Sequence, residues 1–355
     1  MAYKLIGKDF IPPDVLAKVT GKANYAEDIR ADGMVYCRML GSPMPHARVK
    51  NIDISEAKKV KGFLAVLTAD KVPSFPPPNN PILNNEPRFV GEPILAVAAE
   101  TEQAAADAAN LIKLDLEPLP FVTDPLESLF PRGPEARTNG NVANVRLKLQ
   151  TIKWTAKDFA KAGEDELPMG KPAEEWQFGD LDGNFKKADL VVDETFVTAG
   201  YSHHSMEPRS AMAYWRNGKC HVYGSAQSQQ FMIFGLSRYI GIKPPQLVYN
   251  GAFCGGGFGS KGAPYAEMSI PAHMSKLLGG RPVLMRVSRA EEFAIGKGRP
   301  GFQGRVKIGF RKDGRVLAAD MFIVHDNGPN TGFWDFRNAG NSFSIVFQPE
   351  AMRWR

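Results

Sequence analysis

Apolar and polar positions along the chain predict two α/β units. In the first unit the run 93–99 is continuously apolar, as expected for a strand buried on both faces. Thr101 follows it and is a suitable N-cap for a helix over 102–111. Strand–helix–strand spacing indicates helices packed on a sheet. We expect strands over 34–40, 49–54, 62–68, 93–99 and 113–116, and helices over 55–61 and 102–111.

The second unit starts near residue 190 and shows the same alternation. Gly241 is placed to end a helix, and the turn 312–314 (K-D-G) separates two strand-like runs and predicts a hairpin. We expect strands over 191–197, 211–215, 220–225, 246–250, 282–287, 304–310 and 316–325, and helices over 231–240 and 264–278.

Between the two units, residues 118–180 are rich in proline and charge and have weak periodicity. We interpret this stretch as a linker that carries an insertion. The predicted organisation is an α/β domain over 1–125, the linker over 126–185 and a second α/β domain over 186–355.

Composition narrows the class of protein. The chain has 355 residues, 43% hydrophobic and 23% charged, which is typical of a globular protein. Its three cysteines are far apart, which argues against a disulfide framework, a structural zinc site or iron–sulfur ligation by this chain. The net charge of +6 is scattered, which does not favour a nucleic-acid partner and leaves an acidic substrate or partner subunit open. Without a signal peptide or an apolar span, we expect a soluble, cytoplasmic chain.

Residues 255–261 (G-G-G-F-G-S-K) form the most distinctive stretch. Glycines between a strand and a helix allow positive φ values and close approach of the backbone to a ligand. Such a loop suits an oxyanion, a phosphate or a metal-oxo group. The two common phosphate-loop patterns fail, because Ser260 precedes Lys261 and no acidic residue stands where a ribose partner is required. A tight turn without a ligand remains the alternative.

Two further stretches carry polar side chains at strand ends. Residues 225–230 (S-A-Q-S-Q-Q) precede a helix, where glutamines are usually solvent-facing or capping. Residues 203–208 (H-H-S-M-E-P) contain adjacent histidines, which point to opposite faces of a strand and do not form a metal site by themselves. Glu207 precedes a proline, is expected to be extended, and is a candidate to line a cleft.

Taken together and in order, these motifs resemble a known family. The order is H-x-x-M-E-P-R, S-A-Q-S-Q, G-G-G-F-G-S-K and V-S-R-A-E-E-F, preceded by K-V-T-G-K-A-N-Y-A-E-D, P-H-A-R and F-V-G-E-P. The chain resembles the N-terminal half of the large molybdenum subunit of the xanthine dehydrogenase/aldehyde oxidase family. The resemblance covers most of the chain outside the linker.

The resemblance implies an α/β (α+β) fold with an N-terminal hammerhead-like domain followed by the first molybdopterin-binding domain. It implies molybdenum held by a molybdopterin, in a dinucleotide form such as molybdopterin cytosine dinucleotide, and no protein ligand to the metal. Gln227 matches the glutamine that contacts the cofactor's apical oxygen and is the candidate catalytic residue. Gly256, Gly257, Phe258 and Gly259 match the cofactor-binding loop. Expected chemistry is hydroxylation of an electron-poor carbon of an aromatic, heterocyclic or aldehyde-like substrate, with water as the oxygen source.

Two departures from the family pattern qualify these expectations. The family's large subunit is about twice as long, so we expect the second molybdopterin domain and the catalytic glutamate on another chain. We favour such a split subunit over a fragment. Further partners implied are a [2Fe-2S] subunit and an FAD subunit. Gly262 stands where the family often has glutamate, which argues against a purine substrate.

Substrate-side candidates are Glu207 and, in the aromatic segment 333–337, Phe336 and Arg337. Three alternatives stay open: a related hydratase or dehydrogenase, a dehydroxylating reductase, and a non-catalytic assembly subunit.

Overall fold

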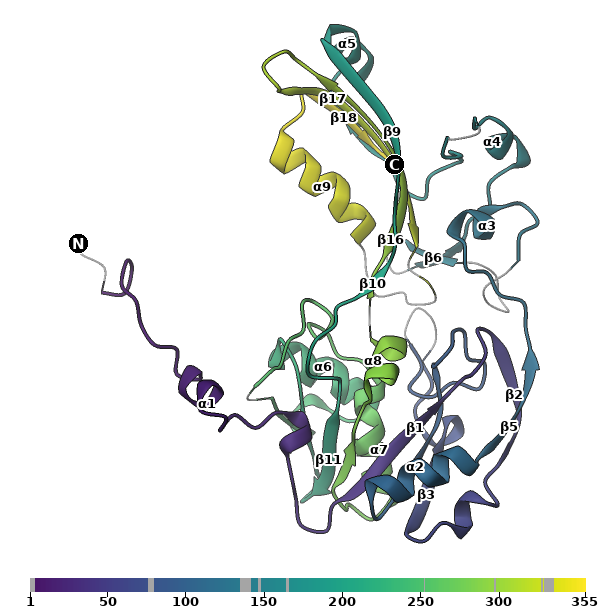
Figure 1. The fold of residues 1–355 in the computed structure, drawn as a ribbon, viewed down its shortest axis with the longest axis vertical. Helices are drawn as coiled ribbons and strands as arrows, with labels where there is room; N and C mark the ends of the chain where they lie inside the picture. The colour runs from purple at the N-terminus through teal and green to yellow at the C-terminus, as the bar shows by residue number, and fades with distance from the viewer. Residues whose placement is uncertain are drawn as a thin grey trace.

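The computed structural model describes residues 4–75, 80–134, 142–145, 148–163, 166–251, 253–296, 298–326, 328 and 335–355. The fold is mixed α/β, as predicted, with a lower body and a sheet that extends upward from it (Figure 1). None of the helices within these ranges is long and apolar enough to cross a membrane.

A seven-stranded sheet forms the centre of the lower body, in the order β13-β12-β11-β14-β1-β4-β3. Its strands come from both predicted domains, because β1 pairs in parallel with β14 through Val35 and Val283. β4 is buried at every position, in agreement with its continuous apolar run. The strands are β1 (Val35–Gly41), β3 (Phe63–Thr68), β4 (Pro93–Ala99), β11 (Ala211–Arg216), β12 (Lys219–Gly224), β13 (Leu247–Asn250) and β14 (Val283–Met285).

Helices cover this sheet and bury its apolar side chains. α2 (Glu102–Leu111) begins at Thr101, whose side chain accepts from the Ala104 N–H, and its alanines pack towards β4. α6 (Gln229–Ile240) and α7 (Ile270–Leu277) enclose a second cluster around Leu236. α8 (Arg289–Ile295) lies at the junction with the upper sheet (Figure 1). Burial of these side chains supplies most of the stabilisation of the lower body.

The upper sheet has five strands, in the order β8-β18-β17-β16-β9. Its centre is the predicted hairpin, with Gly301 of β16 opposite Asp326 of β17. α9 (Asp335–Phe347) lies along this sheet in Figure 1, and α5 (Leu181–Lys187) packs at its far end. The strands are β8 (Trp176–Phe178), β9 (Leu190–Thr198), β16 (Gly301–Phe310), β17 (Val316–Asp326) and β18 (Ala351–Trp354).

The stretch expected to be a linker with an insertion holds short elements. Trp154 and Leu167 from this stretch pack on Phe322 and Val324 of β17, so the stretch shares a small apolar cluster with the upper sheet. Its elements are α3 (Pro125–Leu129), β6 (Val142–Val145), β7 (Lys148–Thr151), α4 (Ala156–Ala160), β8 and most of α5. Small sheets elsewhere pair β2 (Ala47–Asp53) with β5 (Lys113–Pro118) and β10 (Tyr201–Ser202) with β15 (Gly298–Arg299). The proposed domain boundaries themselves stay predictions.

Two predicted helices differ from the structure. Residues 55–61 form only the 3₁₀ turn η2 (Ala57–Lys59). The helix predicted over 264–278 is divided into the 3₁₀ turn η5 (Ala266–Ser269) and α7, which carries Pro271 in its first turn. Proline has no N–H to donate and is best accommodated at a helix start, so α7 begins there. No α-helix therefore starts directly after the glycine loop.

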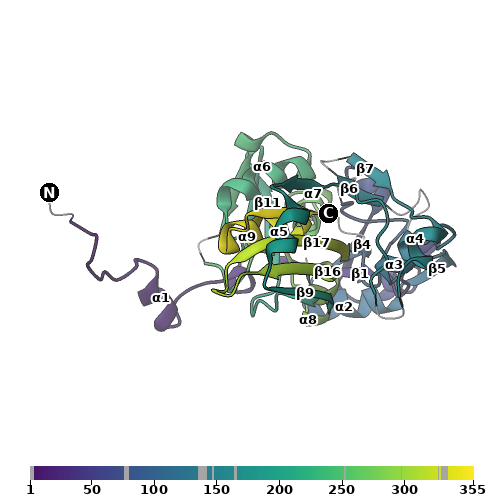
Figure 2. The same ribbon diagram turned by 90° about the horizontal axis from the view of Figure 1, so that it is seen from above.

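The N-terminal segment leaves the body as an extended arm that carries α1 (Val15–Val19), as Figures 1 and 2 show. Its apolar side chains are exposed, including Phe10 and Ile11 at 72% and 81%. The arm joins the body at the 3₁₀ turn η1 (Ala26–Asp28), which contacts β11.

Candidate functional site

The glycine loop, residues 255–261, connects β13 to η5 and adopts an unusual backbone conformation. Gly256 and Gly259 have φ values of +104° and +99°, and Phe258 between them has +50°. A non-glycine residue at positive φ costs on the order of 1–2 kcal/mol, so the surrounding structure must hold Phe258 in place. Phe258 is 63% exposed, so an aromatic residue lies at the outer surface of the loop.

Gln227 is bound to this loop from the end of β12. Its Oε1 accepts hydrogen bonds from Gly259 N at 2.9 Å and from Lys261 N at 3.2 Å. Its own N–H donates to the Lys261 carbonyl at 3.0 Å. A Cβ at Gly257 would lie 2.4 Å from the Gln227 Oε1, so the side chain occupies the space that this glycine leaves. Gln227 and the loop form one unit.

Glu207 lies beneath the loop and is almost completely buried. Its Oε2 accepts from Gly255 N at 2.6 Å, and its Oε1 accepts from Ala26 N at 3.1 Å. A Cβ at Gly255 would come within 2.6 Å of the Glu207 Cβ, so the approach is close. The carboxylate therefore ties the loop to the start of the N-terminal domain.

Lys261 is the second buried charge and has no exposed surface. Its Nζ donates to the Glu207 carbonyl at 2.5 Å and to the Ser225 Oγ at 3.0 Å. The Glu207 Oε2 lies 3.6 Å from the same ammonium group. Burial lowers the pKa of Lys261 below that of a lysine in water, although the facing Glu207 carboxylate favours the charged form.

A buried ion pair supports the other side of the loop. Arg209 pairs with Glu292 of α8 and also donates from Nη2 to the Ser260 carbonyl at 2.9 Å. Arg289, at the start of α8, donates to the Met206 carbonyl at 2.8 Å. Removing one member of such a buried pair typically costs about 3–5 kcal/mol, because the other charge is left uncompensated.

The structure thus assembles the four motifs that lie far apart in the sequence. H-x-x-M-E-P-R supplies Glu207 and Arg209, S-A-Q-S-Q supplies Ser225 and Gln227, and V-S-R-A-E-E-F supplies Glu292. Their polar groups converge on the glycine loop. The predictions for Gln227 and for Gly256, Gly257, Phe258 and Gly259 concern one continuous site.

Other predicted residues have different placements. Glu207 is buried and accepts a hydrogen bond from the backbone of the loop, and it is not exposed in a cleft. Its assignment to the substrate side stays a prediction. Phe336 and Arg337 lie in the first turn of α9, but their side chains fall outside the described residues. His204 has a φ of +50° and packs edge-on against Phe293.

Sequence reasoning did not identify Lys261, Arg209, Ser225 or Glu292 as parts of the site. A signal was present, because a charged residue stood inside three of the motifs. Only the pairing of those charges was hidden, because Lys261 and Glu207 are 54 residues apart in the sequence and Arg209 and Glu292 are 83 apart.

The residues present fit a ligand that carries oxo or phosphate oxygens. A Cβ at Gly259 would clash with nothing and would make ordinary contacts with the Arg299 Nη2 at 3.8 Å and the His203 Nε2 at 3.9 Å. Arg299 also donates to the Phe258 carbonyl at 2.8 Å, which fixes a cation at the loop. The side-chain Oε1 of Gln227 accepts from the loop, the residue is exposed, and among the described residues its Nε2 amide has no protein acceptor. An amide donor, a cation and a glycine-lined approach favour an anionic group.

Metal coordination by side chains is not seen in the described part of the chain, where no three His, Cys, Asp or Glu residues come together. The cysteines Cys37, Cys220 and Cys254 are free thiols.

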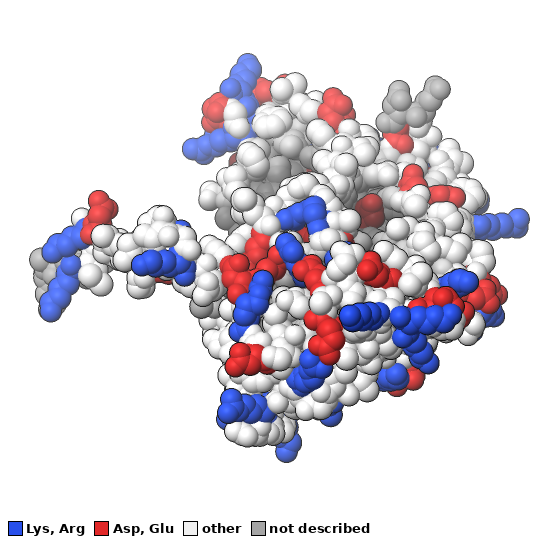
Figure 3. All heavy atoms as spheres, turned by 60° about the horizontal axis from the view of Figure 1, so that its bottom comes forward, with Lys and Arg blue, Asp and Glu red and all other residues white. Residues whose placement is uncertain are grey.

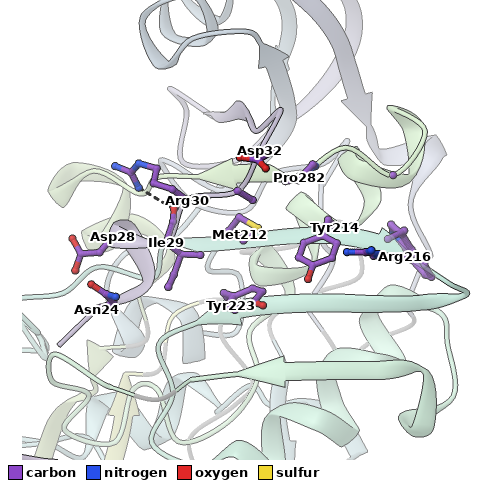
Figure 4. Close-up of a pocket in the computed structure, with 13 residues that line it drawn as sticks. Asn24, Asp28, Ile29, Arg30, Asp32, Met212, Tyr214, Arg216, Tyr223 and Pro282 are labelled. Carbon is purple, nitrogen blue, oxygen red and sulfur yellow. Dashed lines mark hydrogen bonds between the residues drawn. The ribbon is translucent and has the colours of Figure 1, made fainter. Parts of the chain in front are cut away.

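The structure also contains a cavity of about 640 Å³, whose lining residues are drawn in Figure 4. Met212, Tyr214 and Tyr223 of β11 and β12 line it, together with residues 28–32 and Arg216. Both acidic and basic side chains line this cavity. Gln227 and the loop are not among its lining residues, so we assign the candidate site to the loop and not to this cavity.

Comparisons with known proteins agree with this geometry. Residues 20–120 match the a/b hammerhead domain of aldehyde oxidase and xanthine dehydrogenase, and residues 164–346 match the molybdopterin cofactor-binding domain. A probable xanthine dehydrogenase subunit of Bacillus subtilis is 28% identical over 90% of this chain and 40% of its own length. The nicotinate dehydrogenase large molybdopterin subunit of Eubacterium barkeri is 26% identical over 92% of this chain and 71% of its own length.

Among solved structures, the CO dehydrogenase of Oligotropha carboxidovorans superposes with a TM-score of 0.72 at 25% identity. The match covers 89% of this chain and 39% of that one. The chain therefore spans about two fifths of the length of two of these three relatives. Gln227 and the whole glycine loop lie within the matched cofactor-binding domain. The chain belongs to the aldehyde oxidase and xanthine dehydrogenase family of molybdenum oxidoreductases, with a hammerhead domain followed by a molybdopterin cofactor-binding domain.

Proposed function

We propose that this chain is the molybdenum-cofactor-binding subunit of a multi-subunit oxidoreductase that hydroxylates an electron-poor carbon of an organic substrate with oxygen from water. The proposal rests on the hydrogen bonds that join the Gln227 side chain to the glycine loop. Both loop N–H bonds to Oε1 orient the amide so that its Nε2 group is left as an exposed donor. A donor held in this way suits an oxygen bound to a metal.

In this proposal the chain's own residues bind and orient the cofactor. Gln227 donates to an oxygen of the cofactor, Gly256, Gly257 and Gly259 allow its close approach, and Phe258 presents its N–H group beside them. The molybdenum, held by the dithiolene of a molybdopterin in a dinucleotide form such as molybdopterin cytosine dinucleotide, supplies the two-electron redox chemistry when bound. The general base is expected on the second molybdopterin domain.

The proposed partners are a chain with that second domain, a [2Fe-2S] subunit and an FAD subunit. Support comes from the nicotinate dehydrogenase relative, whose name describes a large molybdopterin subunit and of which this chain covers 71%. On the face in Figure 3, basic and acidic side chains are interspersed, which suits protein partners better than nucleic acid. We also propose a cytoplasmic location, because the few cysteines are free thiols.

The test starts with the protein purified from its native source. Molybdenum is measured by mass spectrometry of the metal, and the co-purifying chains are identified. The complex is then assayed with N-heterocycles and aldehydes, a dye as electron acceptor, and ¹⁸O-labelled water. Hydroxylation predicts ¹⁸O in the product together with dye reduction, whereas a hydratase incorporates ¹⁸O without reducing the dye.

Gln227→Ala is expected to lower turnover by about 10²-fold, the typical effect of losing a positioned donor. The matched control is Gln230→Ala, an exposed glutamine in the first turn of α6. A complex that lacks molybdenum, or equal turnover in the two variants, contradicts the proposal.

A further inference from the structure

Lys261 occupies the meeting point of three segments that carry the proposed site. Its backbone N–H donates to the Gln227 Oε1, and its carbonyl accepts from the Gln227 N–H. Its ammonium group reaches across to the segment around Glu207 and to Ser225 at the end of β12. One residue thus joins the loop, the Gln227 segment and the Glu207 segment.

Glu207 contacts the other end of the loop and the N-terminal domain. Its carboxylate accepts a hydrogen bond from Gly255, the first residue of the loop, and lies 3.6 Å from the ammonium group of Lys261, the last residue of the loop. Both ends of the loop are therefore held by one pair of opposite charges. The same carboxylate binds Ala26, so the N-terminal domain is tied to the loop through it.

Burial makes these contacts rigid. Lys261 is fully buried, and the side chain of Glu207 is 7% exposed. Water cannot replace a lost partner at either group, so each hydrogen bond must be made within the protein. A charged, buried network of this kind favours one arrangement of the backbone over others.

We propose that Lys261 and Glu207 are positioning residues that set the orientation of the Gln227 amide through the glycine loop. The inference rests on the proposed function only in taking Gln227 as the group that faces the cofactor. It gives Glu207 a role within the protein in place of a contact with substrate.

The first arm of the test needs no cofactor. Amide hydrogen exchange of the full chain is followed at Gly259, whose N–H is held by Gln227. Lys261→Met removes the ammonium group and keeps a chain of similar length. We expect exchange at Gly259 to become at least about tenfold faster, because the network that holds its acceptor is lost. The control is Lys71→Met, since the Lys71 ammonium also donates to a backbone carbonyl, that of Val66, but in β3.

Two further variants separate positioning from general stability. Lys261→Met combined with Glu207→Gln removes the uncompensated buried charge but places an amide nitrogen at one of the two backbone N–H donors, so global stability should recover in part while exchange at Gly259 stays fast. Ser225→Ala removes one acceptor of the ammonium group and should give a smaller increase, of about threefold, in a protein that folds normally. Exchange at Gly259 indistinguishable from wild type in Ser225→Ala, or recovery of slow exchange in the double variant, overturns the proposal.

The second arm uses the assembled enzyme. The Mo(V) electron paramagnetic resonance spectrum reports the surroundings of the metal, and Lys261→Met is expected to shift it while the Lys71→Met spectrum matches wild type. An identical spectrum in Lys261→Met contradicts the inference. A wild-type complex without molybdenum contradicts the proposed function instead, and Gly259 exchange then decides the positioning role by itself.

Discussion

Replacing Gly257 by alanine tests how closely Gln227 packs on the loop. The added Cβ would lie 2.4 Å from Oε1 and 2.6 Å from the Cδ and Cγ atoms of Gln227. Normal contacts of this kind are about 3.5 Å, so the side chain must move by about 1 Å. Gly257 has no positive φ, so the alanine backbone itself is not strained and the effect reports the contact.

The displacement breaks the two hydrogen bonds from Gly259 and Lys261 to Oε1. At about 0.5–1.5 kcal/mol each, their loss amounts to about 1–3 kcal/mol. The lower entropy of the unfolded alanine chain offsets about 0.4–1 kcal/mol of this. We therefore expect a net loss of about 1–2 kcal/mol in the free energy of unfolding, measured by urea denaturation of the full chain.

A double-mutant cycle with Gln227→Ala tests whether this contact causes the loss of stability. In a Gln227→Ala background the clash is absent, so adding Gly257→Ala should cost nothing and can stabilise the chain slightly. The control is Gly262→Ala, directly after the loop, whose Cβ would meet only the Gly259 carbonyl at 3.3 Å. Additive effects of Gly257→Ala and Gln227→Ala would refute the contact between these residues as the cause.

Two further predictions concern titration and thiol reactivity. Burial lowers the pKa of His273, whose Nε2 forms a hydrogen bond with the Tyr239 carbonyl. As the pH decreases below about 6.5, the unfolded chain binds the proton more readily than the folded chain, so the free energy of unfolding decreases. Urea denaturation between about pH 5 and 7.5 should show this decline flattened in His273→Gln, and parallel curves would contradict it. Burial raises the pKa of Cys220 to about 12 and also raises that of buried Cys37, so a thiol reagent at about pH 8 should react quickly with Cys254 alone. Rapid labelling of all three cysteines in the native chain would contradict this.

Local sequence features predict the secondary structure where local interactions dominate. The continuous apolar run of β4, the Thr101 cap of α2 and the Gly241 end of α6 are local features, and each was predicted correctly. Gly241 has a φ of +78°, a value that glycine adopts without strain. The helix predicted from residue 264 was wrong at its start, because apolar periodicity did not show that the proline at 271 would define the first turn of α7.

The motifs also determined the family, because their order and residue types together are specific, and the matched domains confirm it. Their spacing along the chain did not reveal how they meet. The pairing of β1 with β14 brings together strands about 250 residues apart, and only the folded sheet shows it. Hydrophobic periodicity indicates which face of a strand is buried, but not which strand lies beside it.

The roles of the buried charges follow from the fold and not from the local sequence. In the sequence, Glu207 was a carboxylate before a proline, and Lys261 was the last residue of a glycine loop. In the fold both are buried against each other, where an unpaired charge would be costly, so each takes its hydrogen bonds from the loop and its neighbours. The chemistry of a charged side chain depends on its solvation and its partners, and both are properties of the folded chain.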